Sequence, residues 1–113
     1  MIRNYDITNL NEVAKAIDEW SKEKGFYTPK SLDTELEREQ VLGKLMLITS
    51  ELGEAAEAVR KNDVPNFEEE IGDVIIRALQ LSGGMGIDIR NVIINKMSIN
   101  EGRERRHGKE TSL

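Results

Sequence analysis

The fold is decided by residues 41–60, which read VLGKLMLITSELGEAAEAVR. Apolar side chains recur in this stretch every three or four residues for more than four turns, the period of an α-helix that buries one face. They are Val41, Leu42, Leu45, Ile48, Leu52, Ala55, Ala56 and Val59. We therefore predict one long helix that begins near Asp33 or Thr34 and runs to about Arg60.

Three further helices are predicted from the same period. The first follows Asn9, a residue favoured at the N-cap, and ends at Gly25, which suits a left-handed C-cap. Asn66 caps the next, which stops at residues 83–84, and Asp88 caps the last. Because no stretch alternates as a strand does, the predicted fold class is all-α, and short connections favour a four-helix bundle-like arrangement.

The long helix is apolar on more than one side, and a bundle this small has difficulty burying every apolar stripe. We therefore expect homo-oligomerisation, as a homodimer or a dimer of dimers, to complete the core. The length of 113 residues suits one domain, residues 1–113, with a basic C-terminal tail at 103–113.

Composition excludes several classes of protein. Hydrophobic residues make up 38% of the chain, too many for a disordered chain. The chain has no cysteine and one histidine, which excludes disulfides, thiolate zinc sites and thiol nucleophiles. The first residues, MIRNYD, lack the apolar region of a signal peptide, and no apolar run approaches the length of a membrane span, so the expected location is cytoplasmic and no membrane partner is expected.

Charge is distributed unevenly along the chain. The net charge of −5 argues against binding a nucleic-acid polymer, whose affinity comes largely from neutralising phosphates. Residues 96–109 nevertheless carry a net charge of +3, so the remainder carries −8. A basic end on an acidic body needs an explanation.

Two carboxylate pairs are the main candidates for chemistry. Glu51 and Glu54 form one pair, and Glu70 and Asp73 form the other. Each has i,i+3 spacing, which places both side chains on one helix face. Antiparallel packing across the turn at Pro65 would bring the pairs face to face, where four carboxylates repel one another unless cations neutralise them. Oxygen ligands alone select a hard cation, Mg²⁺, with Mn²⁺ as a substitute.

A glycine precedes the second acid of each pair. A glycine inside a helix costs about 1 kcal/mol relative to alanine, so Gly53 and Gly72 suggest close approach of a backbone or a ligand. The competing interpretation is that these acids simply form a solvated helix face, as acidic i,i+3 pairs usually do.

Lys96, Asn100 and Arg103 follow one another at i, i+4 and i+7. If the helix persists, they form a polar ridge suited to a triphosphate, or to a phosphate and a sugar. Alternatively, they are a basic C-terminus that complements the helix dipole. Glu104 and His107 have the spacing of a di-iron motif, but such bundles need two copies and this chain has one.

Most of the aromatic area surrounds one loop. Trp20 lies at a helical spacing that is more common for core residues, whereas Phe26 and Tyr27 lie in the loop itself, where stacking on a nucleobase is an alternative. Lys30 follows closely and is a candidate to contact a phosphate. We take Trp20, Phe26 and Lys30 as candidate substrate-binding residues.

The ordered set of three motifs resembles a known family. Glu51-x-x-Glu54, then Glu70-x-x-Asp73, then Lys96-x-x-x-Asn100-x-x-Arg103 is similar to the MazG-type nucleotide pyrophosphohydrolases of the all-α NTP pyrophosphatase superfamily. The ending RRHGK at 105–109 is similar to the tails of short MazG-like proteins, and the loop at 26–32 resembles that of dCTP-pyrophosphatase relatives. Ser50 departs from the pattern, since many members carry another glutamate there.

The resemblance implies an enzyme that cleaves a nucleoside triphosphate between its α and β phosphates. Mg²⁺ held by Glu51, Glu54, Glu70 and Asp73 would bridge phosphates and lower the pKa of the attacking water. Glu51 or Glu54 would also orient that water. Lys96, Asn100 and Arg103 would grip phosphates or sugar, and family sites are built at subunit contacts.

The implied role is cleansing of the nucleotide pool. Two alternatives stay open. One is a phosphoribosyl-ATP pyrophosphohydrolase-like activity within the same superfamily, and the other is a non-catalytic helical dimer that acts as a nucleotide- or metal-binding scaffold.

Overall fold

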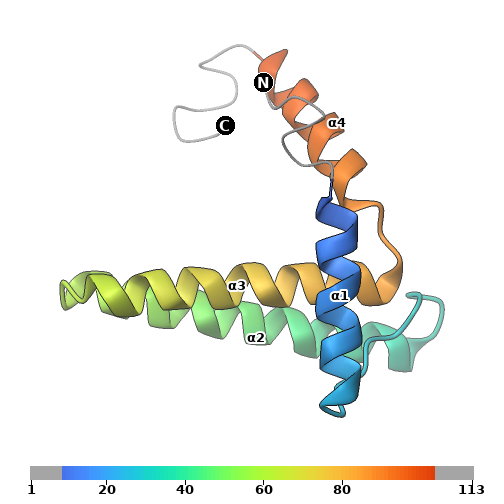
Figure 1. Ribbon diagram of the computed structural model, residues 1–113, viewed down its shortest axis with the longest axis horizontal. Helices are drawn as coiled ribbons and strands as arrows, with labels where there is room; N and C mark the ends of the chain where they lie inside the picture. The colour runs from blue at the N-terminus through green and yellow to red at the C-terminus, as the bar shows by residue number, and fades with distance from the viewer. Residues whose placement is uncertain (1–8, 104–113) are drawn as a thin grey trace. The chain divides into compact units, whose positions relative to one another are not determined.

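The computed structural model describes residues 9–103 (Figure 1). Its four helices are α1 (Leu10–Glu23), α2 (Glu35–Arg60), α3 (Val64–Met85) and α4 (Ile89–Glu101). No strand occurs among these residues, so the predicted all-α class is confirmed. The described chain divides into two compact units, residues 13–87 and a second built from residues 9–12 and 88–103, and each is described by itself.

The long helix α2 begins where the sequence predicts. Thr34 is its N-cap, and its hydroxyl accepts a hydrogen bond from the Glu37 backbone N–H at 3.1 Å. The Glu37 carboxylate accepts one from the Thr34 backbone N–H at 3.0 Å. This reciprocal capping box satisfies two backbone donors that the helix itself leaves unpaired, and so fixes the start of the helix.

The start of α3 differs from the prediction that Asn66 is its cap. The helix begins at Val64, and the N-cap is Asp63, whose carboxylate accepts a hydrogen bond from the Asn66 backbone N–H at 3.2 Å. Pro65 then lies in the first turn, where a missing backbone N–H removes no helical hydrogen bond. The proline therefore belongs to the helix start and does not keep the helix from forming there.

The end of α3 also differs from the prediction. The helix runs through Gly83 and Gly84 and ends at Met85, and Gly86 is its C-cap, with the left-handed φ of 70° typical of that position. A Cβ on Gly83 would overlap the Ala14 backbone, and one on Gly84 would lie 2.5 Å from the Thr28 Cβ. The two glycines thus let α1 and the following loop pack directly on α3.

Helices α2 and α3 lie side by side and antiparallel, joined by residues 61–63 (Figure 1). In this part of the chain the buried apolar residues are small: Ala14, Val41, Ala55 and Ala58. Larger side chains of the hairpin, among them Leu42, Met46 and Ile75, are more than half exposed. This agrees with a long helix that is apolar on more than one side, while the predicted self-association stays a prediction.

Helix α4 begins at the predicted cap. The Asp88 carboxylate accepts hydrogen bonds from the Asn91 backbone N–H at 3.3 Å and from the Asn11 amide at 2.8 Å. The helix ends at Glu101, with Gly102 as C-cap. None of the described helices is long and apolar enough to cross a membrane. Glu104, His107 and the rest of the tail after residue 103 lie outside the described residues.

Candidate metal and nucleotide site

Three of the four predicted carboxylates meet across the α2–α3 hairpin. Glu51 comes from α2, and Glu70 and Asp73 come from α3. One carboxylate oxygen from each lies within 4.8 Å of the others, and we call this group the acidic cluster. It forms because antiparallel packing sets the middle of α2 against the first half of α3. The i,i+3 spacing then turns both α3 acids toward the same side.

Glu54 does not join this group. Its residue is exposed, and it lies almost one turn beyond Glu51 on α2. Its charge still acts on the cluster, because it contributes to the raised pKa of Glu70. The sequence predicts all four acids in one cleft; the structure brings Glu51, Glu70 and Asp73 together, with Glu54 outside this group but close enough to act on it.

Glu70 is the most perturbed of these acids. Its pKa is raised to about 7, first by the hydrogen bond that a protonated Glu70 shares with Glu51, then by burial and by the charges of Glu54, Glu51 and Asp73. Its Oε1 atom is buried and accepts no hydrogen bond within the described chain. A buried carboxylate oxygen without a donor, set among other carboxylates, is the environment that a bound cation relieves.

Arg77 is a site residue that the sequence analysis did not select. It follows Asp73 by four residues on α3, and its Nε donates to Glu51 Oε1 at 3.3 Å. The Glu51 side chain is only 14% exposed, whereas that of Arg77 is 41% exposed. Its i,i+4 relation to Asp73 was the signal that would have found it, since it places the guanidinium on the same helix face.

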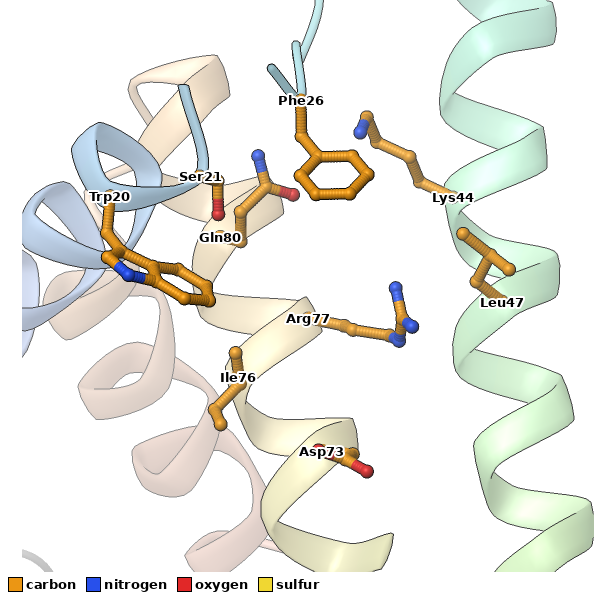
Figure 2. A pocket seen from close by; sticks show the side chains of 9 residues that line it. All are labelled: Trp20, Ser21, Phe26, Lys44, Leu47, Asp73, Ile76, Arg77 and Gln80. Carbon is orange, nitrogen blue, oxygen red and sulfur yellow. The ribbon is translucent and has the colours of Figure 1, made fainter. Parts of the chain in front are cut away.

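A cavity of about 540 Å³ adjoins the acidic cluster (Figure 2). Asp73, Arg77 and Gln80 face it from α3, at positions i, i+4 and i+7. Trp20 and Phe26 contribute aromatic side chains from α1 and the loop after it, and Lys44 and Leu47 line it from α2. The structure thus brings the predicted aromatic residues and one predicted metal ligand to the same cavity.

Exposure at the aromatic end of the cavity is high. Trp20 is 55% exposed and Phe26 is 62% exposed, so Trp20 is not a core residue as its helical spacing would suggest. Lys30 is exposed and is not among the residues that line the cavity. Lys44, which does line it, is a second residue that the sequence analysis did not select.

The predicted basic ridge is shorter than expected. Lys96 and Asn100 lie on α4 in the second unit, but α4 ends at Glu101, so Arg103 follows the helix and is not part of it. The backbone N–H of Arg103 instead donates to the Asn100 carbonyl at 3.2 Å, within the turn that follows the helix.

Gly53 and Gly72, the glycines that precede Glu54 and Asp73, were predicted to allow close approach of a backbone or a ligand. A Cβ placed on Gly53 or Gly72 would meet nothing within 4 Å in the described chain. Among residues 9–103, therefore, no backbone makes the close approach that was one of the two predicted causes, and the other, close approach of a ligand, stays a prediction.

The site is a cluster of carboxylates on a helical hairpin, the donor type that hard cations prefer, and it adjoins a cavity lined in part by aromatic side chains. Residues 39–107 match the family model described as the MazG nucleotide pyrophosphohydrolase domain. The chain belongs to this family, as its motifs predicted. No curated protein and no solved structure gives a significant match to it. The matched residues include the acidic cluster but not Trp20 or Phe26.

Proposed function

We propose that this protein is a magnesium-dependent nucleoside triphosphate pyrophosphohydrolase, which cleaves (d)NTP to (d)NMP and pyrophosphate for cleansing of the nucleotide pool. The observation that carries the proposal is the buried, unpaired Oε1 of Glu70 inside the acidic cluster, at the edge of the cavity. A solvated acidic face, the competing interpretation, would leave that oxygen in water. Membership of the MazG family supports the same assignment.

Glu51, Glu70 and Asp73 offer three oxygen ligands, the donor type that Mg²⁺ prefers, with Mn²⁺ as a substitute. The cation would neutralise charge on the phosphates and acidify an attacking water. Glu54 completes the proposed ligand set from the edge of the cluster, and Glu51 or Glu54 orients the water as a general base.

The cavity residues divide into two chemical groups. Arg77, which pairs with Glu51 of the acidic cluster, and Lys44, which lies beside Phe26, are cations that suit phosphate oxygens. Trp20 and Phe26 suit the face of a nucleobase. Lys96, Asn100 and Arg103 are proposed to contact phosphate or sugar, and Lys30 a phosphate. The exposed apolar side chains of α2 and α3 support the further proposal that two copies associate.

The test is incubation of the pure protein with a panel of NTPs, dNTPs and phosphoribosyl-ATP, in Mg²⁺ or in EDTA, with identification of the products. We expect monophosphate and pyrophosphate to form in Mg²⁺ but not in EDTA. Glu70→Gln and Asp73→Asn should lower kcat/KM at least about 100-fold, because a lost metal ligand removes several kcal/mol of charge stabilisation.

Glu57→Gln is the matched control, since Glu57 is an exposed α2 acid that pairs with Arg60 and Lys61 outside the cluster. Preference for phosphoribosyl-ATP would select the alternative substrate. If no triphosphate yields pyrophosphate in Mg²⁺, the proposed activity is wrong, and Mg²⁺ binding without turnover would identify a scaffold.

A further inference from the structure

One polar residue of the cavity is held by a network that the proposed reaction does not use. Gln80 donates from its amide nitrogen to Asp18 Oδ1 at 3.3 Å and to the Thr28 hydroxyl. Asp18 is only 3% exposed and pairs with Lys22 at 3.1 Å, and Thr28 is fully buried. The network joins α1, α3 and the loop at residues 26–32, which we call the aromatic loop, all within residues 13–87.

The chemistry of this network fixes which way the Gln80 amide points. An ionised carboxylate only accepts hydrogen bonds, so the NH₂ group of the amide must face Asp18. The carbonyl oxygen, Oε1, is therefore turned to the other side. Figure 2 shows it on the Phe26 side of the amide, and Gln80 lines the cavity there. Within the described chain, the side-chain hydrogen bonds of Gln80 are both made by its amide nitrogen.

The spacing along α3 suits a nucleotide. Gln80 follows Asp73 by seven residues, a rise of about 10 Å along the helix. A phosphate bound at the acidic cluster therefore leaves room for the sugar beside Arg77 before the base reaches Gln80. The aromatic side chains of Trp20 and Phe26 line the cavity at that end.

We propose that Gln80 is a specificity-determining residue whose carbonyl oxygen, oriented by Asp18 and Thr28, accepts a hydrogen bond from an N–H group of the nucleobase. The inference rests on the proposed function and deepens it. Amino groups and ring N–H groups are both suitable donors, but they lie at different positions on the edges of different bases. A fixed acceptor thus distinguishes bases, whereas a freely turning amide would match either a donor or an acceptor.

The test compares two substrates of one sugar type: the nucleotide that the wild-type protein hydrolyses best, and the corresponding triphosphate that carries hydrogen in place of the base. Gln80→Leu keeps the size of the side chain and removes the acceptor. We expect kcat/KM for the nucleotide to fall about tenfold, from the loss of one hydrogen bond, while kcat/KM for the base-free triphosphate changes less than twofold.

A second variant acts on the orientation alone. In Asp18→Asn, the new amide can donate to Gln80 and so allow its carbonyl oxygen to turn away from the cavity. We expect the ratio of kcat/KM between amino-bearing and keto-bearing bases to change at least about threefold, with the base-free triphosphate again unaffected. Gln40→Leu, the same substitution at an exposed position of α2, is the matched control.

Binding of a non-hydrolysable α,β-methylene nucleotide, measured by calorimetry, should follow the same pattern, and circular dichroism checks that each variant is folded. Equal losses on both substrates would show a merely structural role and overturn the inference. An unchanged ratio in Gln80→Leu would overturn it while leaving the proposed function intact. Failure of the wild-type protein to hydrolyse any triphosphate would overturn both.

Discussion

Replacing Glu70 by glutamine removes the carboxylate whose pKa the acidic cluster raises from 4.5 to about 7. In the unfolded chain this pKa returns to its ordinary value, so between the two values the folded protein holds a proton that the unfolded chain has lost. From these values, unfolding releases about 0.9 proton from this group at pH 6 and about 0.1 at pH 8.

The raised pKa of Glu70 determines whether stability rises or falls with pH. A carboxyl group with a raised pKa favours the folded state while it is protonated, and this contribution is lost as the pH rises through 7. Without metal, the wild-type protein should therefore become less stable between pH 6 and pH 8, because the cluster becomes fully charged. Glu70→Gln should show a smaller decrease, since the amide carries no charge at any of these pH values.

The assay is thermal unfolding in EDTA at pH 6, 7 and 8, followed by circular dichroism, with Glu57→Gln as the control that removes an acid outside the cluster. Glu70→Gln should melt above the wild type at pH 8, and Mg²⁺ should raise the melting temperature of the wild type but not that of the variant. Parallel pH dependence of the wild type and Glu70→Gln would refute this account of the cluster.

Four further variants test other parts of the structure. Arg77→Met should tighten Mg²⁺ binding, measured by calorimetry, because it removes a competing cation from Glu51. The same variant should raise the KM for nucleotide severalfold in steady-state kinetics. Weaker binding of Mg²⁺ as well as of nucleotide would contradict the proposed role of Arg77. Gly83→Ala should destabilise the fold by about 1–3 kcal/mol through overlap with the α1 backbone, whereas Gly43→Ala, with open space around it, should stabilise α2 by up to about 1 kcal/mol in urea denaturation. Thr34→Ala should cost about 0.5–2 kcal/mol in the same assay by removing half of the capping box; an unchanged midpoint would show that the cap does not matter.

The sequence alone determined the helices and their best-defined ends. The helical period of residues 41–60 and the capping hydrogen bonds of Thr34 and Asp88 involve residues at most a few positions apart, so local physics suffices to predict them. The two i,i+3 carboxylate pairs were visible for the same reason. Their meeting needed one further assumption, antiparallel packing across the short turn, which the α2–α3 hairpin fulfils for Glu51, Glu70 and Asp73.

Tertiary structure decided the features in which local signals competed or were silent. Asp63 and Asn66 are both good caps, and the helix begins at the earlier one, since Pro65 is tolerated in a first turn. Gly83 and Gly84 look like a helix end, yet they pack against α1 and the aromatic loop inside a continuous helix. Close packing between elements is what favours glycine there, and no local pattern reports it.

The site residues divide in the same way. Paired carboxylates can be recognised in the sequence from their spacing alone. Arg77 becomes a site residue through its contact with Glu51 on α2. Gln80 becomes one through its hydrogen bonds to Asp18 and Thr28. These partners are separated from them by 26 to 62 positions in the chain. Such contacts arise only when the helices pack, so the sequence determined which charges are available and the tertiary structure decided which of them act together.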